Sequence, residues 1–281
     1  MSIIYTMKNR KYLTLVLLFL TLLKGYSQNS KEDWVTFVSK KNKGMMTVLV
    51  NLQYDYAKPN YKNVLIVGTH INNCYKNGYP KSQGLENIYS FSDSIATIIS
   101  QHTKNRLAGI ITYQCTGFDI YYVKDTLQIR SAIQHYFDRD YKKSKNYLVI
   151  ERDKKWKYYK ENLLPKNDWT DDYFMNQDLL SQLVSEGDNL ALARKVSHWI
   201  NFTKAKKRQQ FIKKIKEFKF TIDSLSFKKE TKSPFVVKIS IQDNLIPSNL
   251  LKITALVKLI AKSTSGTYDG WGAEPVIENK R

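Results

Sequence analysis

The sequence predicts an α+β protein of two ferredoxin-like (βαββαβ) sandwiches, each an antiparallel sheet with helices on one face. Three observations lead to this fold class. The chain has 281 residues, 42% of them apolar, which is enough for two cores in domains of about 100 to 150 residues. Apolar residues alternate in some segments and recur at three- and four-residue spacing in others. In both halves these segments follow the order of a split βαβ unit.

The first 27 residues are expected to be a signal peptide that precedes both domains. Three basic residues at positions 8 to 11 are followed by an uncharged apolar run at 12–23 and by Gly25-Tyr26-Ser27, an order typical of secretory signals. The run is shorter than the about 20 apolar residues of a permanent membrane anchor. We therefore expect cleavage after Ser27 and an exported protein, periplasmic or secreted, with an uncleaved anchor as the alternative. Translation can start at Met1 or at Met7.

The first domain is predicted at residues 28–160 and has one strand more than a ferredoxin-like unit. The predicted elements are strands 45–53 and 63–71, a helix at 86–102, strands 107–116 and 118–124, a helix at 125–137, and a strand at 147–152. Asp125 can cap the second helix. A polar, aromatic-rich stretch with Pro165 follows, and a linker is expected at 161–174.

The second domain is predicted at residues 175–281. Gly187 is expected to end its first helix, and Pro247 suits the first turn of its last helix because proline lacks a backbone N–H. The predicted elements are a helix at 176–186, a strand at 194–202, a helix after Thr203, strands 220–227 and 234–242, a helix from 247 that Gly266 stops, and a strand at 268–277.

Both halves carry residues that resemble known families. The second half resembles the family of the regulator of ribonuclease E activity B at Gly187-Asp188, Arg194, His198-Trp199, Phe202 and Gly266-x-Tyr268-Asp269-Gly270-Trp271. The first half resembles domain-of-unknown-function family 695 at Gly78-Tyr79-Pro80 and Trp156-x-Tyr158-Tyr159. The founding regulator binds and inhibits a cytoplasmic endoribonuclease and is not itself an enzyme, so the resemblance implies a protein-interaction or regulatory module. A signal peptide would take this chain away from that target, which leaves the protein partner unknown.

An interaction surface is expected where the first and last strands of the second domain lie side by side. Alternation places His198 toward the helices, bonded to Asp269 or Tyr268, and places Trp199 on the opposite, open face. Gly270 is expected to permit a bulge or a tight bend. The candidate surface residues are Trp199, Lys195, Trp271, Asp269 and Tyr268. The residues expected to maintain the fold are Gly187, Asp188, Arg194, His198, Gly266 and Gly270.

The charge leaves a second function open. The net charge is +20, and loss of the four basic residues of the signal peptide leaves +16, a surplus that attracts nucleic acid, anionic lipid or acidic polysaccharide. Thirty-seven of the 45 basic residues are lysines, whereas phosphate sites favour the planar fork of arginine. The helix after Thr203 is either an anionic-surface contact or a solvated face. Its basic residues are Lys204, Lys206, Lys207, Arg208, Lys213, Lys214 and Lys216.

The sequence contains no recognisable catalytic set, and no metal or cofactor is expected. The four histidines lack the spacing of a zinc site, and glycine-rich phosphate loops and Gly-x-Ser-x-Gly motifs are missing. A hydrolase with a site between the domains is therefore the weakest of the alternatives, after protein interaction and polyanion binding. Cys74 and Cys115 are either a disulfide, as an oxidising compartment would allow, or two buried thiols.

Overall fold

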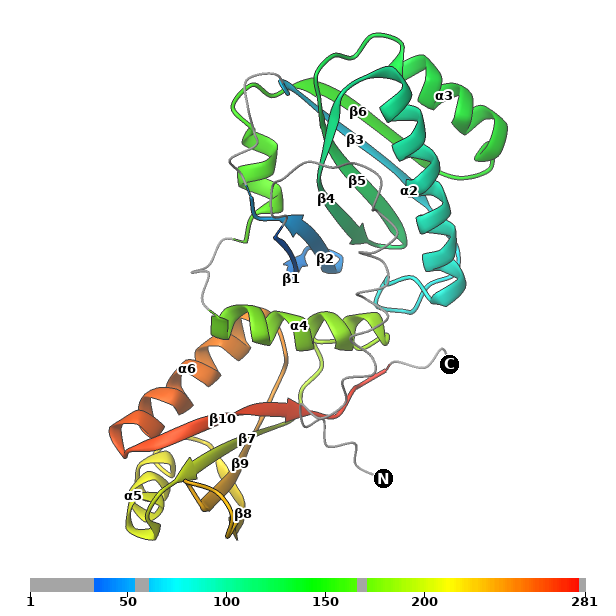
Figure 1. The fold of residues 1–281 in the computed structure, drawn as a ribbon. Coiled ribbons are helices and arrows are strands. Elements are labelled where there is room, and N and C mark those ends of the chain that lie inside the picture. Colours follow the sequence, from blue (N-terminus) through cyan, green and yellow to red (C-terminus); the bar gives the residue numbers. More distant parts are fainter. Residues whose placement is uncertain (1–32, 54–60, 166–170, 278–281) are drawn as a thin grey trace. The chain divides into compact units, whose positions relative to one another are not determined.

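The computed structural model describes residues 33–53, 61–165 and 171–277 (Figure 1). The predicted signal peptide lies outside the described residues. The chain divides into two compact units, which we describe separately. The N-terminal unit comprises Glu32–Ala193, Asn244–Ile253 and the segment from Pro275, and the C-terminal unit comprises Arg194–Asp243 and Thr254–Glu274. Each unit contains one antiparallel sheet with helices, so the predicted α+β class with two antiparallel sheets is confirmed.

The sheet of the N-terminal unit has six strands in the order β1-β2-β4-β5-β3-β6. The strands are β1 (Trp34–Lys41), β2 (Gly44–Asn51), β3 (Asn63–His70), β4 (Asn105–Tyr113), β5 (Thr116–Val123) and β6 (Asn146–Arg152). The four strands from β3 to β6 have the neighbours expected of a split βαβ unit. Two strands, β1 and β2, extend the sheet beyond β4, whereas the sequence predicted only one additional strand. The strand that was not predicted is β1. In this edge strand only Phe37 and Val38 are buried, so the apolar alternation is weak.

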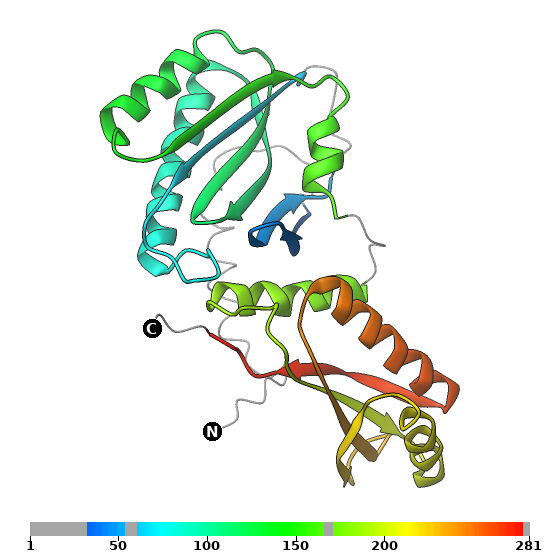
Figure 2. The same ribbon diagram turned by 180° about the vertical axis from the view of Figure 1, so that it is seen from behind.

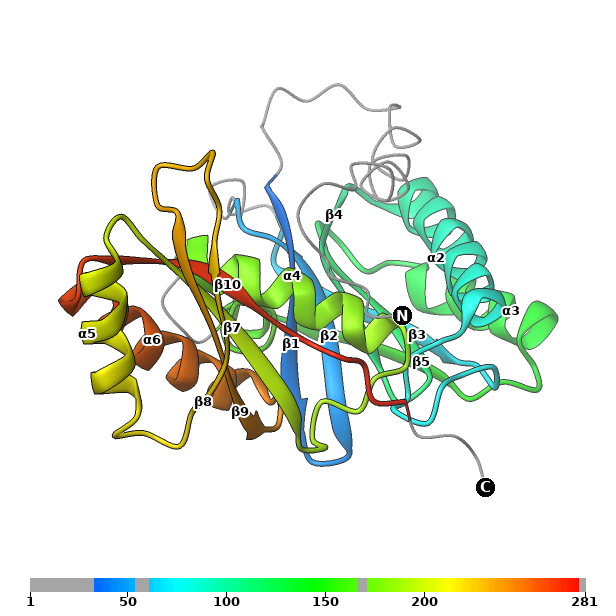
Figure 3. The same cartoon turned by 90° about the horizontal axis from the view of Figure 1, so that it is seen from below.

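Two helices, α2 (Ser82–His102) and α3 (Ile129–Asp140), pack side by side on one face of this sheet (Figures 2 and 3). The predicted stripe of α2 is buried there, including Phe91 and Ile95. Helix α3 begins later than predicted. The carboxylate of Asp125 accepts a hydrogen bond from the amide of Leu127 at 2.9 Å, in the turn before the helix, and does not cap it.

The opposite face of the six-stranded sheet is covered by residues 156–163, which include the start of the stretch predicted as a linker. Trp156 stacks on Tyr122 with ring centroids 3.7 Å apart, and its Nε1 donates to the carbonyl oxygen of Tyr61 at 2.9 Å. Tyr159 and Leu163, in the short π-helix η2 (Tyr159–Leu163), are buried in the same cluster. The aromatic residues of this stretch therefore belong to a core.

Helix α4 (Asp171–Ser185) also belongs to the N-terminal unit. The backbone N–H of Val38 in β1 donates to Gln177 Oε1 at 2.8 Å. Gly187 follows the helix with a positive φ of 92°, the conformation expected of a glycine that ends a helix. The amides of Gly187 and Asp188 bond back to the carbonyls of Val184 and Leu183, which makes a Schellman motif.

The sheet of the C-terminal unit has the order β10-β7-β9-β8. Its elements along the chain are β7 (Arg194–Phe202), α5 (Ala205–Ile215), β8 (Thr221–Phe227), β9 (Phe235–Asp243), the part of α6 (Pro247–Ser263) from Thr254 onward, and β10 (Gly266–Ala273). The element order matches the prediction, and the first and last strands are neighbours, as Figure 3 shows. Pro247 is the first residue of α6, where its missing N–H costs no helical hydrogen bond.

Candidate functional site

A β-bulge in β10 decides which side chains share a face of the C-terminal sheet. The register between β10 and β7 shifts between Tyr268 and Gly270, so that Asp269 is the extra residue. Gly270 has a φ of 137°, which agrees with the predicted bulge. Beyond the bulge Trp271 lies opposite His198, and Gly270 lies opposite Trp199. Cross-strand partners point to the same face, so the structure separates Trp271 from Trp199. The single aromatic surface expected from the sequence does not form.

His198 is a core residue on the helix-covered face. Its side chain is fully buried, and Nδ1 lies 2.9 Å from the hydroxyl of Tyr268, one of the two partners expected. The edge of Phe220 packs against the imidazole ring. Burial lowers the pKa of His198 from 6.5 to about 4. His198 is therefore neutral at physiological pH.

Trp199 lies on the opposite face beside Lys238. The Lys238 ammonium is 5.2 Å from the centroid of the Trp199 ring, within the range of a cation–π contact. A methyl group at Gly272 would lie 3.4 Å from the same ring, so the absence of a side chain there gives the indole room. Lys195 is paired with Asp223 at 2.9 Å, and Ser240 donates to the same carboxylate oxygen. Lys238 is thus the cation next to the tryptophan, and the charge of Lys195 is neutralised.

Strand β8 is an exposed edge of this sheet. Leu225 and Phe227 remain 47% and 59% exposed. The amide of Lys228, just after β8, donates to the carbonyl of Pro234, just before β9. In an antiparallel pair alternate residues bond to the partner strand, so Leu225 and Phe227 direct their backbone groups away from β9. The edge therefore offers backbone hydrogen-bonding groups together with two apolar side chains.

The basic helix predicted after Thr203 is α5, and its cations have two roles. Arg208 Nη1 donates to the carbonyls of Ser226 and Val236 at 2.9 and 3.1 Å, so this residue fastens the helix to the sheet. Lys214 donates to Ser263 at 3.1 Å. The remaining lysines lie at the surface, with Lys207 half-buried. They are Lys204, Lys206, Lys207, Lys213 and Lys216.

The other signature residues of the second half have structural positions. Asp188 is fully buried and accepts a hydrogen bond from the amide of Val276 at 2.7 Å. Arg194 is buried, and its Nη1 donates to the carbonyl of Glu274 at 3.4 Å. A side chain at Gly266 would collide with the ring of Phe202. Asp188 and Arg194 thus bind the segment that follows β10, and Gly266 leaves room for the ring of Phe202.

The signature of the first half surrounds a disulfide. Cys74 and Cys115 are joined, with their Cα atoms 5.9 Å apart. The amide of Cys115 donates to the carbonyl of Gly78 at 2.8 Å. Gly78 has a φ of 86°, and a methyl group there would lie 2.9 Å from Gln114 Nε2. Burial, with a smaller effect of Tyr89, raises the pKa of Tyr79 to about 12. This segment is a tightly packed turn.

A buried carboxyl group in β5 was not anticipated from the sequence. Asp119 is 2% exposed and accepts a hydrogen bond from the hydroxyl of Ser92 at 3.0 Å. Burial raises its pKa from 3.8 to about 7; Ser92 acts in the opposite direction, and Asp93 adds to the increase. Asp119 is therefore a titrating group inside the core near neutral pH.

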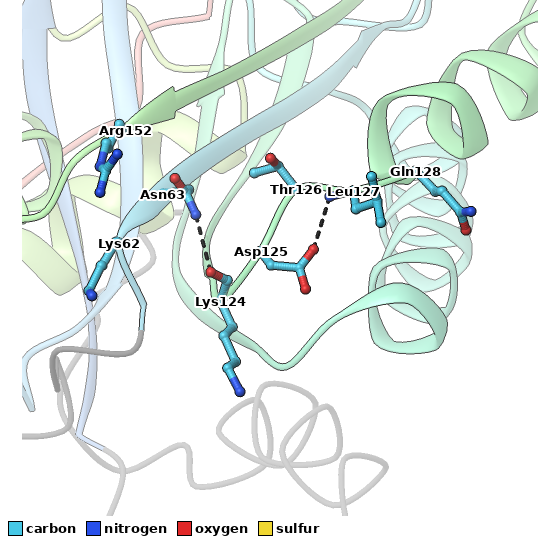
Figure 4. Close-up of a pocket in the computed structure, with 8 residues that line it drawn as sticks. All are labelled: Lys62, Asn63, Lys124, Asp125, Thr126, Leu127, Gln128 and Arg152. Carbon is cyan, nitrogen blue, oxygen red and sulfur yellow. Dashed lines mark hydrogen bonds between the residues drawn. The ribbon is translucent and has the colours of Figure 1, made fainter.

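Two neighbouring pockets of the N-terminal unit are each lined by three or more basic residues. The first, of about 650 Å³, lies at one end of the sheet, where β5 and β6 end and β3 begins (Figure 4). Its cations are Lys62, Lys124 and Arg152, which flank these strand ends. The second pocket, of about 540 Å³, shares Arg152 and is lined by Lys154, Lys155, Lys157 and Lys160. The cations of the first pocket come from three distant segments, so no local sequence motif predicts them. Those of the second pocket lie in one segment, residues 152–160.

Within the described residues, no group of three or more histidine, cysteine, aspartate or glutamate side chains is placed to hold a metal ion. None of the helices in the described part of the chain is long and apolar enough to cross a membrane.

These features define an α+β protein of two compact units, each with signature residues that maintain its fold. Residues 32–164 match the family described as Family of unknown function (DUF695), and residues 174–273 match the family described as Regulator of ribonuclease activity B. The resemblance of each half is thereby confirmed.

Among curated proteins, none is detectably similar to this chain. Two solved structures are similar at low identity. An unknown protein from Galdieria sulphuraria is 8% identical, over 77% of this chain and 99% of that one, with a TM-score of 0.19. A putative glycine cleavage system transcriptional repressor is 9% identical, over 77% of this chain and 98% of that one, with a TM-score of 0.20. Similarity at this level carries no argument about function.

Proposed function

We propose that the protein is a non-enzymatic regulatory module that acts by binding another protein. The similarity of residues 174–273 to a regulator of ribonuclease activity supports a regulatory role, without identifying the target. We also propose that both halves are elaborations of the ferredoxin-like sandwich, supported by the shared neighbour order of their four core strands.

The exposed edge strand β8 is the observation that carries the proposal. Its outward backbone groups can pair with an extended segment of a partner, and Leu225 and Phe227 supply apolar contacts on alternate positions. Three lysines in the turn after β8, at positions 228, 229 and 232, favour a partner segment with acidic residues. The Trp199 face is a separate surface of the same sheet, which allows the two to be tested independently.

Leu225→Pro is expected to abolish partner binding while the fold persists. The substitution removes an N–H that points away from β9, and proline is tolerated on an edge strand in that position. Cross-linking capture from envelope extracts, followed by identification of the captured proteins, measures the effect. Trp199→Ala is the matched control on the other surface. A partner retained by Leu225→Pro and lost by Trp199→Ala would transfer the site to the open face of the sheet.

We further propose that the chain is exported. The basic, apolar and small-residue order of the first 27 residues supports export, and the Cys74–Cys115 disulfide fits an oxidising compartment. Cell fractionation and N-terminal sequencing of the mature chain are expected to give a periplasmic or secreted protein that starts near Gln28. Recovery of an intact N-terminus from the cytoplasm would contradict export.

A second candidate function is polyanion binding through α5. The C-terminal unit contains 16 basic and 6 acidic residues, and most of the α5 lysines are at the surface. Of the seven basic residues predicted for this role, Arg208 is engaged by backbone carbonyls. The candidate therefore rests on lysines alone, which act as point charges without a fixed fork.

A further inference from the structure

We propose that the two adjoining basic pockets of the N-terminal unit bind a linear polyanion through closely spaced phosphate groups. The inference concerns the N-terminal unit and is independent of the interaction proposed for β8.

The strand register explains why the cations meet. Asn63, the first residue of β3, lies opposite Val123 in β5 and opposite Arg152 in β6. Lys62 precedes β3 and Lys124 follows β5, so both lie at the same end of the sheet as Arg152. The side-chain amide of Asn63 donates to the carbonyl of Lys124 at 3.3 Å, which fixes the backbone between the strands (Figure 4). The backbone beneath the first pocket is thus part of the regular pairing of β5, β3 and β6.

The second pocket is held by two inward anchors on either side of Lys154 and Lys155. On one side, Asp153 accepts hydrogen bonds from the hydroxyl of Tyr122 at 2.6 Å and from two backbone amides. On the other, Trp156 is buried on Tyr122. Both lysines between the anchors are exposed. The loop therefore presents its two cations to solvent from a fixed backbone, which reduces the entropy lost on binding.

The carboxylates near the pockets are already engaged. Burial alone would raise the pKa of Asp153, but its hydrogen bonds lower it, so it remains a carboxylate committed to Tyr122 and the backbone. Asp125 accepts the amide of Leu127, and Glu161 lies 3.9 Å from Lys157. Within the described residues, the side chains of the basic set Lys62, Lys124, Arg152, Lys154 and Lys155 have no ion pair or hydrogen bond. These five cations are available to an anionic ligand.

The residues that line the two pockets favour a ligand that has phosphate groups but no nucleobases. Among the described residues that line the two pockets none is aromatic, and single-stranded nucleic acid is held largely by stacking on aromatic rings. Lysines dominate, with Arg152 shared between the pockets, so recognition depends on charge density along the ligand. A chain of phosphates long enough to reach both pockets satisfies these conditions.

Isothermal titration calorimetry of the full chain, with inorganic tripolyphosphate and with a longer linear polyphosphate as ligands, measures the affinity and tests the inference. The longer chain is expected to bind more tightly, with an affinity that falls as salt is raised. The double variant Lys154→Gln, Lys155→Gln should weaken binding at least about fivefold, from the worth of two exposed ion pairs. Arg152→Gln should weaken it similarly, because this residue serves both pockets. Circular dichroism verifies that these exposed changes leave the fold intact.

The matched control is Lys142→Gln, Lys143→Gln, two exposed lysines in the loop before β6. It removes the same charge from the same unit, at the opposite end of β6 from Arg152, and is expected to leave the affinity within about twofold. Equal losses in the two double variants would assign the binding to overall charge and would overturn the pockets. If tripolyphosphate bound as tightly as the long chain, the claim that one ligand reaches both pockets would be wrong. Absence of binding at physiological salt, or tighter binding of single-stranded DNA than of polyphosphate, would overturn the ligand class.

Discussion

Replacement of Asp119 by asparagine is expected to raise the free energy of unfolding by about 4 kcal/mol at about pH 8, the largest effect that the structure predicts. The pKa of Asp119 is raised from 3.8 to about 7 by burial. Between these values the folded protein keeps a proton that the unfolded chain has lost, so stability falls as the pH rises through this window and is constant above it. Asparagine retains the hydrogen-bond acceptor for Ser92 and carries no charge, which removes the penalty.

Urea denaturation of the wild type and Asp119→Asn at several pH values between about 4 and 8 measures this effect. The variant should show little pH dependence from this site, and the two proteins should converge near pH 4. Asp93→Asn is a control, because loss of the neighbouring negative charge lowers the pKa of Asp119 and narrows the window. An Asp119→Asn protein that is less stable than the wild type at pH 8 would show that the ionised carboxylate is stabilised.

His198 is expected to give the C-terminal unit the opposite pH response. Its pKa is lowered from 6.5 to about 4, so below pH 6.5 the unfolded chain takes up a proton that the folded chain does not. The free energy of unfolding therefore has its full value above pH 6.5 and decreases by about 3 kcal/mol as the pH falls to about 4. His198→Leu should remove this decrease, since leucine is compatible with a buried position beside Phe220.

The measurement is again urea denaturation across this pH range, followed by the fluorescence of the tryptophans in the C-terminal unit, Trp199 and Trp271. Tyr268→Phe is the matched control, because it deletes the hydroxyl that contacts Nδ1 and leaves the imidazole buried. That variant should keep the acid sensitivity although it loses stability at every pH. If His198→Leu and the wild type lost stability in parallel on acidification, the histidine would not be the responsible group.

Local patterns predicted much of the fold. The apolar stripe of α2, the end of α4 at Gly187 and the burial of His198 each depend on residues close together in the sequence. Strand β1 was missed because few of its side chains are buried. The first basic pocket was missed because Lys62, Lys124 and Arg152 meet only after three distant strands align. The second is lined by one segment, residues 152–161, in which the sequence indicated only a polar, aromatic-rich stretch. Asp119 gave no signal, because a single carboxyl group in a strand is more often exposed than buried.

The prediction that Trp271 shares a face with Trp199 was wrong for a different reason. The sequence predicts a bulge or a tight bend at Gly270, but it does not predict the register of the residues that follow. One extra residue inverts the alternation of every position after it. Trp271 therefore joins the face of His198.

The same bulge makes this face of the sheet depend on the pairing of β10 more than on the identity of its residues. Without the bulge, and with Asp269 kept, regular alternation would place Gly270 opposite His198 and Trp271 opposite Ser197, on the side of Trp199. Loss of Asp269 would instead leave a regular strand in which Trp271 still lies opposite His198. A shift of one position in the pairing of β10, without any change in its side chains, therefore determines whether this face offers a partner one tryptophan or two.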